Sequence, residues 1–200
     1  MPRVKQRTDD LQQRGLASAL AVLDEEGVTA LTTRTVARRA GASVPAIYEV
    51  FGDKAGIVRE VYFEGFRLLA ERLAAVPVTP DPLEALRRLA ESFRRFILDH
   101  AVLAEVMFAR PFADFDPTQD EVRAGVEVRK IFVDHARYAV ERGHFHGDPT
   151  DIALIFFTVV EGLTGAEKAN RLGSSKQSAN RRFRLGINTL IAGFAHSGPE

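Results

Sequence analysis

The stretch LTTRTVARRAGASVPAIYEVFGDK, residues 31–54, decides the fold. It contains two short runs with helical spacing, separated by three small residues. Helices of barely two turns are marginal alone, so these two must pack on each other and on a third helix. Thr32 and Ser43 are placed to cap the two helix starts, and Gly41 supplies a left-handed turn residue between them. Pro45 falls in a first turn, where its missing N–H had no acceptor, so it marks a helix start rather than a break.

The two helices present one apolar face and one polar face. The positions expected to pack inward against a preceding helix are Val36, Ala37, Ala40, Ile47, Val50 and Phe51. The residues expected on the outer face are Thr33, Arg34, Arg38, Tyr48 and Lys54. Two short helices joined by a glycine turn, with hydrogen-bond donors outside, are the layout of a helix-turn-helix, whose helix N-termini also attract phosphates. The competing interpretation is a helical hairpin whose charged face is merely solvated.

The same helical period of 3.6 residues continues along the chain, and no sustained alternation predicts a strand. The sequence therefore predicts an all-α protein of about nine helices. Besides the two short ones, we expect helices at 8–26, 53–75, 82–99, 101–109, 117–142, 149–169 and 176–195. Asp-Pro pairs mark three of the starts, at residues 81, 116 and 148, and Gly27, Gly143 and Gly173 are expected stops. Gly15 is a weak point in the first helix, costing about 1 kcal/mol relative to Ala.

The composition narrows the functional classes. The 200 residues carry a formal net charge of zero, so any nucleic-acid surface must come from local placement of charge. The chain has no cysteine, which excludes disulfides, thiolate metal sites and a cysteine nucleophile. The basic N-terminus lacks the apolar segment of a secretory signal, and the apolar run 152–160 is about half of the ~20 residues that span a bilayer. We expect a soluble cytoplasmic protein.

The segment LTTRTVARRAGASVPAIYEVFGDKAGIV resembles the DNA-binding segment of the TetR family of bacterial transcriptional regulators. The resemblance covers roughly residues 8–60 and includes LTTR, the A..AG.S pattern, the Y..F pair and the lysine that opens the next helix. It implies a three-helix DNA-binding domain, residues 1–53, joined by a long helix to a helical ligand-binding and dimerisation domain, residues 54–200. The C-terminal part loosely resembles a class with a Trp-x3-His-Gly signature, with Phe157 and Glu161 in place of Trp and His.

The resemblance also implies roles for individual residues. Phosphate contacts are expected from Thr33, Tyr48 and Lys54, and base-edge contacts from Arg34, Val44, Pro45 and Ala46. The chemistry agrees, because Arg can bind guanine O6 and N7 with two hydrogen bonds and small apolar groups can meet thymine methyls. Glu49 either accepts from a cytosine amino group or points away, and we favour pointing away. Arg3, Lys5 and Arg7 form a basic arm that either enters the minor groove or is a disordered terminus.

An enzyme is the second functional class to weigh. The sequence has no G-x-x-x-x-G-K-[ST], no G-x-S-x-G and no H-E-x-x-H motif. HFHGD at 144–148 places two imidazoles and a carboxylate within one short segment, but its spacing matches no zinc pattern, and a loop between helices explains Gly143, Gly147 and Asp148 as cap residues. We expect no enzymatic activity, no cofactor and no metal.

Aromatic and soft apolar side chains with a few polar groups suit a small-molecule cavity. The candidate ligand-binding residues are His100, Met107, Phe108, Phe112, Phe132, His135, Tyr138, Phe156 and Glu161, and ordinary core packing is the other interpretation for most of them. Glu161 lies in an otherwise apolar helix, where a carboxylate needs a partner. It either hydrogen-bonds an inducer or pairs with an Arg at a dimer seam.

The small residues of the last two helices favour a homodimer. Close helix approach is possible at Gly162, Gly165, Ala166, Gly186, Ala192 and Gly193, and two helices per subunit would form a four-helix seam near 149–169 and 176–195. The sequence thus predicts a homodimeric, ligand-responsive repressor that a small-molecule inducer releases from an inverted-repeat operator on double-stranded DNA. The alternatives are an all-helical interaction module and a constitutive DNA binder without an inducer.

Overall fold

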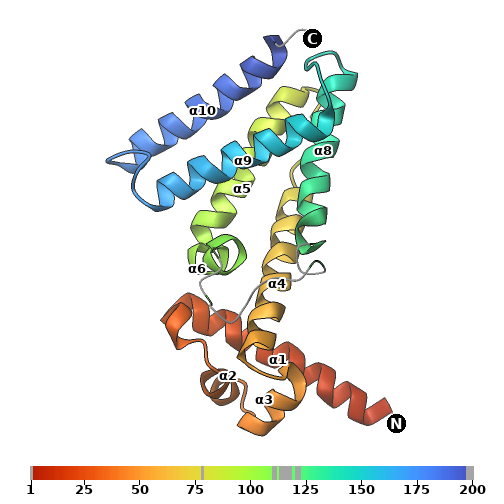
Figure 1. Ribbon diagram of the computed structural model, residues 1–200, viewed down its shortest axis with the longest axis vertical. Coiled ribbons are helices and arrows are strands. Elements are labelled where there is room, and N and C mark those ends of the chain that lie inside the picture. Colours follow the sequence, from red (N-terminus) through yellow and green to blue (C-terminus); the bar gives the residue numbers. More distant parts are fainter. Residues whose placement is uncertain (1, 78, 110–111, 113–118, 120–122, 197–200) are drawn as a thin grey trace. The chain divides into compact units, whose positions relative to one another are not determined.

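The computed structural model describes residues 2–77, 79–109, 112, 119 and 123–196. Within these residues the chain is all-α, as predicted, and contains no strand (Figure 1). The α-helices are α1 (Pro2–Glu26), α2 (Thr33–Arg39), α3 (Val44–Phe51), α4 (Lys54–Ala74), α5 (Pro82–Asp99), α6 (Ala101–Ala104), α8 (Val126–Glu141), α9 (Pro149–Lys168) and α10 (Lys176–His196). Short 3₁₀ segments lie at Val28–Ala30 and Arg123–Gly125, and a π-helical segment lies at Glu105–Ala109.

The helix boundaries differ from the predicted ones at three places. The helix predicted from residue 8 begins at Pro2, and the helix predicted at 117–142 is described only from Arg123, so its expected Asp-Pro start lies outside the described residues. After α9 the left-handed residue is Asn170, with φ of 55°, rather than Gly173. Asn adopts this conformation more readily than most residues because its short polar side chain can bond locally.

The predicted caps are confirmed. The Thr32 hydroxyl accepts from the Thr35 N–H at 3.1 Å, and the Ser43 hydroxyl accepts from the Ala46 N–H at 3.3 Å. Asp148 accepts from two backbone N–H groups of α9, at 2.7 and 3.1 Å, and these hydrogen bonds lower the pKa of its carboxyl. Gly41, between α2 and α3, has φ of 62°, the left-handed conformation that the turn requires.

The chain forms two compact units. The first contains residues 1–67 and 100–124, and the second contains residues 68–99 and 125–200. Helix α4 contributes residues to both units. The predicted functional boundary after residue 53 falls inside the first unit, which also holds α6 and the π-helical segment.

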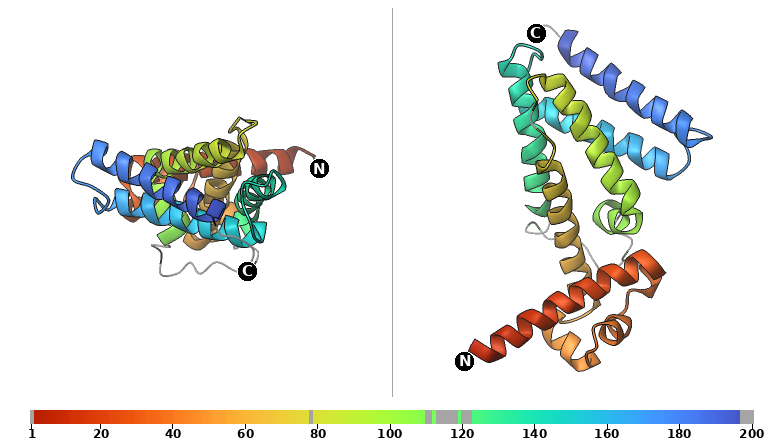
Figure 2. Two further views of the ribbon diagram at one scale, coloured as in Figure 1. Left: turned by 90° about the horizontal axis from the view of Figure 1, so that it is seen from above. Right: turned by 180° about the vertical axis from the view of Figure 1, so that it is seen from behind.

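In the first unit, α2 and α3 pack on each other and on the same side of α1 (Figures 1 and 2). Leu31, Val36 and Ile47 are each fully buried in this small core. Gly15 of α1 lies against α3, because a Cβ at this position would come within 2.6 Å of the Phe51 ring. The glycine that the sequence marks as a weak point is therefore the contact that lets α3 approach α1.

In the second unit, α9 packs against α8, α5 and α10, and α10 also contacts α5 (Figure 1). Aromatic rings fill the core: the centroid of Phe132 lies 5.3 Å from that of Phe157 and 6.3 Å from that of Phe93. Helix α10 approaches α9 closely at Gly186, where a Cβ would come within 2.8 Å of Leu163. Gly186 thus serves packing inside the protomer, whereas a Cβ on Gly162 would meet nothing within 4 Å.

Candidate nucleic-acid interface

The outer face of the α2–α3 hairpin is polar. Arg34 and Arg38 of α2 are exposed, as are Glu49 of α3 and Lys54 at the start of α4, and Tyr48 is 50% exposed. The inward set is buried apart from Val50, which is half-buried. The hairpin therefore has the two faces that the sequence predicts, with cationic and hydroxyl-bearing side chains available to a partner.

Thr33 is the exception on this face. Only 8% of its surface is exposed, so the expectation that its side chain lies outside is wrong. Thr33 lies three, four and seven residues before Val36, Ala37 and Ala40, which places all of them on one side of α2. The helical period itself assigns Thr33 to the inner face, next to the buried apolar residues.

The first turn of α3 is small and only partly covered. Pro45 is exposed, and Val44 and Ala46 are half-buried. Pro45 occupies one of the first two helical positions, as predicted. A turn without long side chains leaves room for a nucleic-acid base edge to approach the backbone at the positive end of the helix dipole.

Two other arginines of this unit are used inside it. Arg39 forms ion pairs with Glu25 and with Glu26, the latter at 3.8 Å, and its hydrogen bond to Glu25 raises the pKa of the guanidinium. Arg14 donates to the Ala40 carbonyl at the end of α2, at 2.7 Å. These contacts fix α2 to both halves of α1. Sequence spacing did not predict them, because they join residues that are 13 to 26 positions apart.

The junction between α3 and α4 is tight. The Asp53 carboxylate caps α4 by accepting from the Gly56 N–H at 2.8 Å. A Cβ on Gly56 would lie 1.7 Å from the Phe51 carbonyl oxygen, so only glycine fits there. The Lys54 ammonium lies 5.0 Å from the centroid of the Phe112 ring, a favourable cation–π distance. Lys54 is thus held at a defined place beside the end of α3.

The basic arm lies at the start of α1. The backbone of residues 2–7 belongs to this helix, and the side chains of Arg3, Lys5 and Arg7 lie outside the described part of the structure.

The candidate ligand-binding residues divide between the two units. His100, Met107, Phe108 and Phe112 belong to the first unit. Met107 packs against Gly65 of α4, where a Cβ added to the glycine would lie 2.7 Å from the Met107 sulfur. The centroid of the Phe108 ring lies 5.5 Å from that of the Phe66 ring. These contacts join the π-helical segment to α4.

Phe132, His135, Tyr138, Phe156 and Glu161 belong to the second unit. Phe132 and Phe156 are each 1% exposed and lie 6.2 Å apart, so they form part of the packed core. The Nδ1 atom of His135 donates to the Ile131 carbonyl at 2.8 Å, and the Tyr138 hydroxyl accepts from Arg142 at 3.0 Å. Glu161 is half-buried, and this burial raises the pKa of its carboxyl. A cavity in this unit, formed by α5, α9 and α10, is lined by other residues than these five.

Two short capped helices on a supporting α1, with a polar outer face, define a helix-turn-helix protein of the DNA-binding class. Comparison with known proteins identifies the family. The family described as bacterial regulatory proteins, tetR family, matches residues 16–61, and the family described as tetracyclin repressor-like, C-terminal domain, matches residues 86–190. The second match covers more than half of the chain, and the protein belongs to the TetR family of transcriptional regulators.

Individual relatives agree with this assignment. The chain is 25% identical over 191 residues to the tetracycline repressor protein class A from transposon 1721 of Escherichia coli, covering 92% of this chain and 81% of the relative. It is 29% identical over 165 residues to the HTH-type transcriptional repressor KstR2 of Mycobacterium tuberculosis, covering 78% and 79%.

Solved structures share the fold. A protein of unknown function from Rhodococcus sp. RHA1 has a TM-score of 0.81 at 24% identity, covering 93% of this chain and 96% of the other. A TetR variant from Acinetobacter baumannii AYE in complex with minocycline has a TM-score of 0.65 at 23% identity, covering 93% and 97%.

Proposed function

We propose that this regulator is a cytoplasmic homodimeric repressor that reads an inverted-repeat operator with α3 and leaves it when a small-molecule inducer binds. The α2–α3 hairpin is the main support for DNA binding. Its apolar residues are buried, whereas Arg34, Arg38 and Tyr48 and the adjacent Lys54 remain accessible. The relatives that support the repressor role are the class A tetracycline repressor and KstR2.

Seven residues of this region have a proposed task at the DNA. Arg34 contacts a base edge at the start of α2, and Val44, Pro45 and Ala46 present apolar surface to the major groove at the start of α3. Tyr48 and Lys54 contact phosphates from the end of α3 and the start of α4. Thr33 is covered by its own unit, so its proposed phosphate contact is made by the backbone N–H of the first turn of α2.

The dimer forms through α9 and α10. Three large apolar side chains on these helices are strongly exposed: Leu154 at 53%, Ile155 at 48% and Leu185 at 64%. Helix α9 has the length and composition of a membrane-spanning helix, yet only 28% of its most apolar 18-residue window is buried in the protomer. A second copy that covers this face removes the apolar surface from water and forms a four-helix seam. Gly162 and Gly165 leave open space for a partner helix.

The inducer acts through α4. This helix of 21 residues is roughly 32 Å long, at ~1.5 Å per residue, and it contributes residues to both compact units. A ligand changes operator affinity only if it binds the DNA-competent and the released conformations with different affinities. The TetR variant from Acinetobacter baumannii was solved in complex with minocycline, which supports a small organic inducer for this chain.

A gel-shift titration with DNA from beside the protein's own gene tests this function. We expect retention of a fragment that contains an inverted repeat, and no comparable retention of a fragment in which one half-site is scrambled. Equal binding to both fragments would reduce the protein to a nonspecific binder. If operator binding is specific but no co-purified or added ligand weakens it, the protein is a constitutive DNA binder and the inducer part is wrong.

A further inference from the structure

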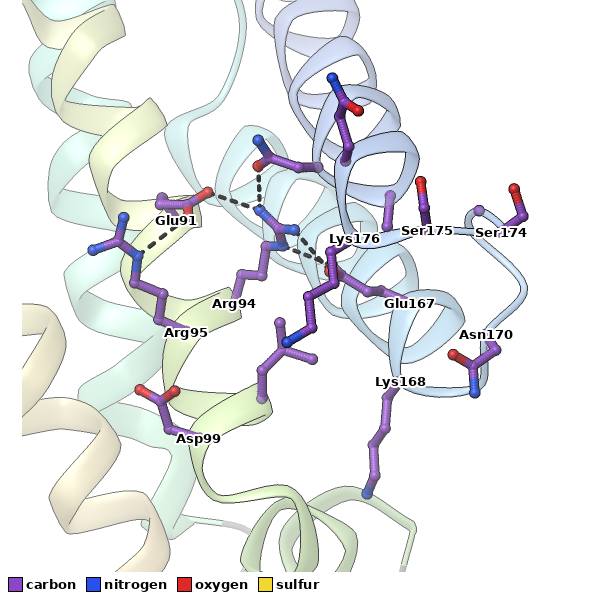
Figure 3. A pocket seen from close by; sticks show the side chains of 15 residues that line it. Glu91, Arg94, Arg95, Asp99, Glu167, Lys168, Asn170, Ser174, Ser175 and Lys176 are labelled. Atoms are coloured by element: carbon purple, nitrogen blue, oxygen red, sulfur yellow. Dashed lines mark hydrogen bonds and ion pairs between the residues drawn. The ribbon is translucent and has the colours of Figure 1, made fainter.

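The second unit contains an open cavity of about 1240 Å³ whose lining includes many charged and polar residues and no aromatic residue. The walls come from the C-terminal half of α5, the end of α9, the loop that follows it and the first turn of α10 (Figure 3). The lining residues are Glu91, Arg94, Arg95, Leu98, Asp99, Glu167, Lys168, Asn170, Gly173, Ser174, Ser175, Lys176, Gln177, Ala179 and Asn180. The volume is sufficient for a small metabolite.

A buried ion pair forms one wall of this cavity. Arg94 donates to both carboxylate oxygens of Glu167, at 2.6 and 2.7 Å, and to the amide oxygen of Asn180, at 2.9 Å. Its side chain is 7% exposed, its guanidinium lies 4.6 Å from the centroid of the Phe183 ring, and hydrogen bonding to Glu167 raises its pKa. Because a two-pronged arginine–carboxylate pair fixes both side chains, this wall is rigid before any ligand enters.

The charges around the opening are paired, with one clear exception. Arg95 pairs with Glu91 at 3.2 Å, and Asp99 pairs with Arg72 at 3.2 Å. Lys176 is exposed, and among the described residues its ammonium group has no hydrogen-bond or ion-pair partner. In Figure 3 the Lys176 side chain extends from the start of α10 across the cavity toward α5. A single unpaired cation beside paired charges attracts an anionic group.

The amide of Asn180 adds direction to this site. Because its oxygen accepts from Arg94, its NH₂ group is oriented by the ion pair and remains a donor. Lys176 and Asn180 lie four residues apart, on one face of α10. A fixed neutral donor and a flexible cation on one wall suit a ligand that carries a carboxylate or phosphate group and a second hydrogen-bond acceptor.

We propose that this cavity is a second ligand site, which binds a small molecule through an anionic group held by Lys176 and through a second acceptor group that meets the Asn180 amide. The ion pair between Arg94 and Glu167 positions Asn180 and stays intact when the ligand binds. The ligand's apolar remainder lies along the α5 wall, against Leu98. The site does not include the aromatic residues proposed for the inducer. The proposed binding is therefore independent of whether the protein responds to that inducer.

The proposed dimer leaves this site open. Lys176 and Leu185 are nine residues apart on α10, and at ~100° per residue they lie on opposite faces of the helix. The face with Leu185 meets the partner subunit, so the face with Lys176 and Asn180 stays accessible to small molecules.

Equilibrium dialysis of the full-length protein tests the proposal without DNA. Radiolabelled succinate and inorganic phosphate are the two probes, used separately at constant ionic strength. We expect saturable binding of at least one probe, with one site per chain. Preference for succinate identifies a carboxylic acid as the ligand type, and preference for phosphate identifies a phosphate ester.

Two variants locate the binding. Lys176→Gln removes the cation and should weaken binding about tenfold, the loss expected for one charge-assisted hydrogen bond. Leu98→Trp fills the cavity without changing its charge and should abolish binding. Lys130→Gln, which removes an exposed lysine of α8 outside the cavity, is the matched control and should bind as the unmodified protein does. Absence of saturable binding would overturn the proposal. Binding that survives both cavity variants would place the probe outside the cavity and would overturn it as well.

Discussion

The α2–α3 hairpin and the α9–α10 pair are both two helices joined by a short connection, yet they leave opposite kinds of surface uncovered. The α2–α3 hairpin buries its apolar residues inside the first unit and exposes arginine, tyrosine and lysine. The α9–α10 pair also has a buried face, but it leaves Leu154, Ile155 and Leu185 largely exposed. The two pairs therefore require different partners.

This difference follows from the physical chemistry of the two partners. DNA offers phosphates and polar base edges, so its binding face can remain hydrated while the protein is free. A second copy of the chain offers apolar surface, and burial of about 25 cal/mol per Å² drives that association. The exposed polar side chains of the α2–α3 hairpin thus suit the proposed DNA face, and the exposed leucine and isoleucine of α9 and α10 suit the proposed dimer face.

The largest expected effect comes from breaking the apolar pair. Leu185→Asp places a charge on each side of the proposed seam and removes two leucines from it by symmetry, a loss of about 3–6 kcal/mol. The dimer should weaken about 100-fold or more, and sedimentation velocity at micromolar concentration should detect monomer. Val126→Asp, at a 42% exposed position that starts α8, is the control and should remain dimeric. A dimeric Leu185→Asp protein would place the interface elsewhere.

The next effect separates two roles within the α2–α3 hairpin. Arg34→Ala should cost roughly 1–3 kcal/mol of operator affinity and relax preference at one base pair per half-site, because a base-reading hydrogen bond is lost. Lys54→Ala should weaken all sequences alike and reduce the salt dependence by about one unit of slope, because a phosphate contact is lost. Fluorescence anisotropy with a panel of single-base operator variants at several salt concentrations measures both.

If Lys54→Ala changes base preference and Arg34→Ala does not, the proposed orientation of α3 is wrong. If neither substitution changes DNA binding, the hairpin has only a structural role.

A pair of glycines sharpens the contrast between packing within and between protomers. In Gly15→Ala the new methyl group meets the Phe51 ring, so overpacking of about 1–3 kcal/mol outweighs a helix-propensity gain of about 1 kcal/mol. The melting temperature should fall. In Gly162→Ala the methyl group meets nothing inside the protomer, so any loss must come from the partner subunit and should depend on protein concentration. A concentration-independent loss in Gly162→Ala would contradict the seam at α9.

The smallest effect concerns the carboxyl of Glu161, whose pKa is raised by burial. A raised folded-state pKa means that this group's contribution to stability is full below its unfolded pKa and is lost as pH rises through the folded pKa. Glu161→Gln removes this loss, so the variant should be more stable than the unmodified protein at pH 7, and the difference should close near pH 4. Thermal melts across this range provide the measurement. A constant difference at all pH values would show that titration of Glu161 is not its cause.

The α2–α3 hairpin was largely predictable because its determinants are local. Thr32, Gly41 and Ser43 act on groups within a few positions of themselves, and the structure confirms all three. Thr33 was assigned to the wrong face although its spacing to Val36 indicates the inner one. The packing role of Gly15 could not be predicted from the sequence of α1 alone, because the ring that it contacts, Phe51, lies on α3.

The bundle was predictable in its helices but not in its polar contacts. Arg94 and Glu167 are 73 residues apart, and neither has a local signal that names the other. The cavity beside them depends on how three helices meet, which no single helical pattern contains. Residue type alone supports the aromatic ligand candidates, and two of them, Phe132 and Phe156, lie in the packed core. A ligand site formed by residues far apart in the sequence can be located only in the structure, whereas a capped helical hairpin can be predicted from the sequence.

In the proposed function, two α3 helices of a symmetric dimer read two half-sites on one face of the duplex. A series of synthetic operators with the inverted half-sites moved apart one base pair at a time tests it directly, with affinity measured at fixed salt. We predict maximal affinity when the half-site centres lie about 34–36 Å apart or at a multiple of this distance, and a loss when the helical phase is broken. Affinity that does not depend on spacing, or equal affinity for direct repeats, would contradict the account.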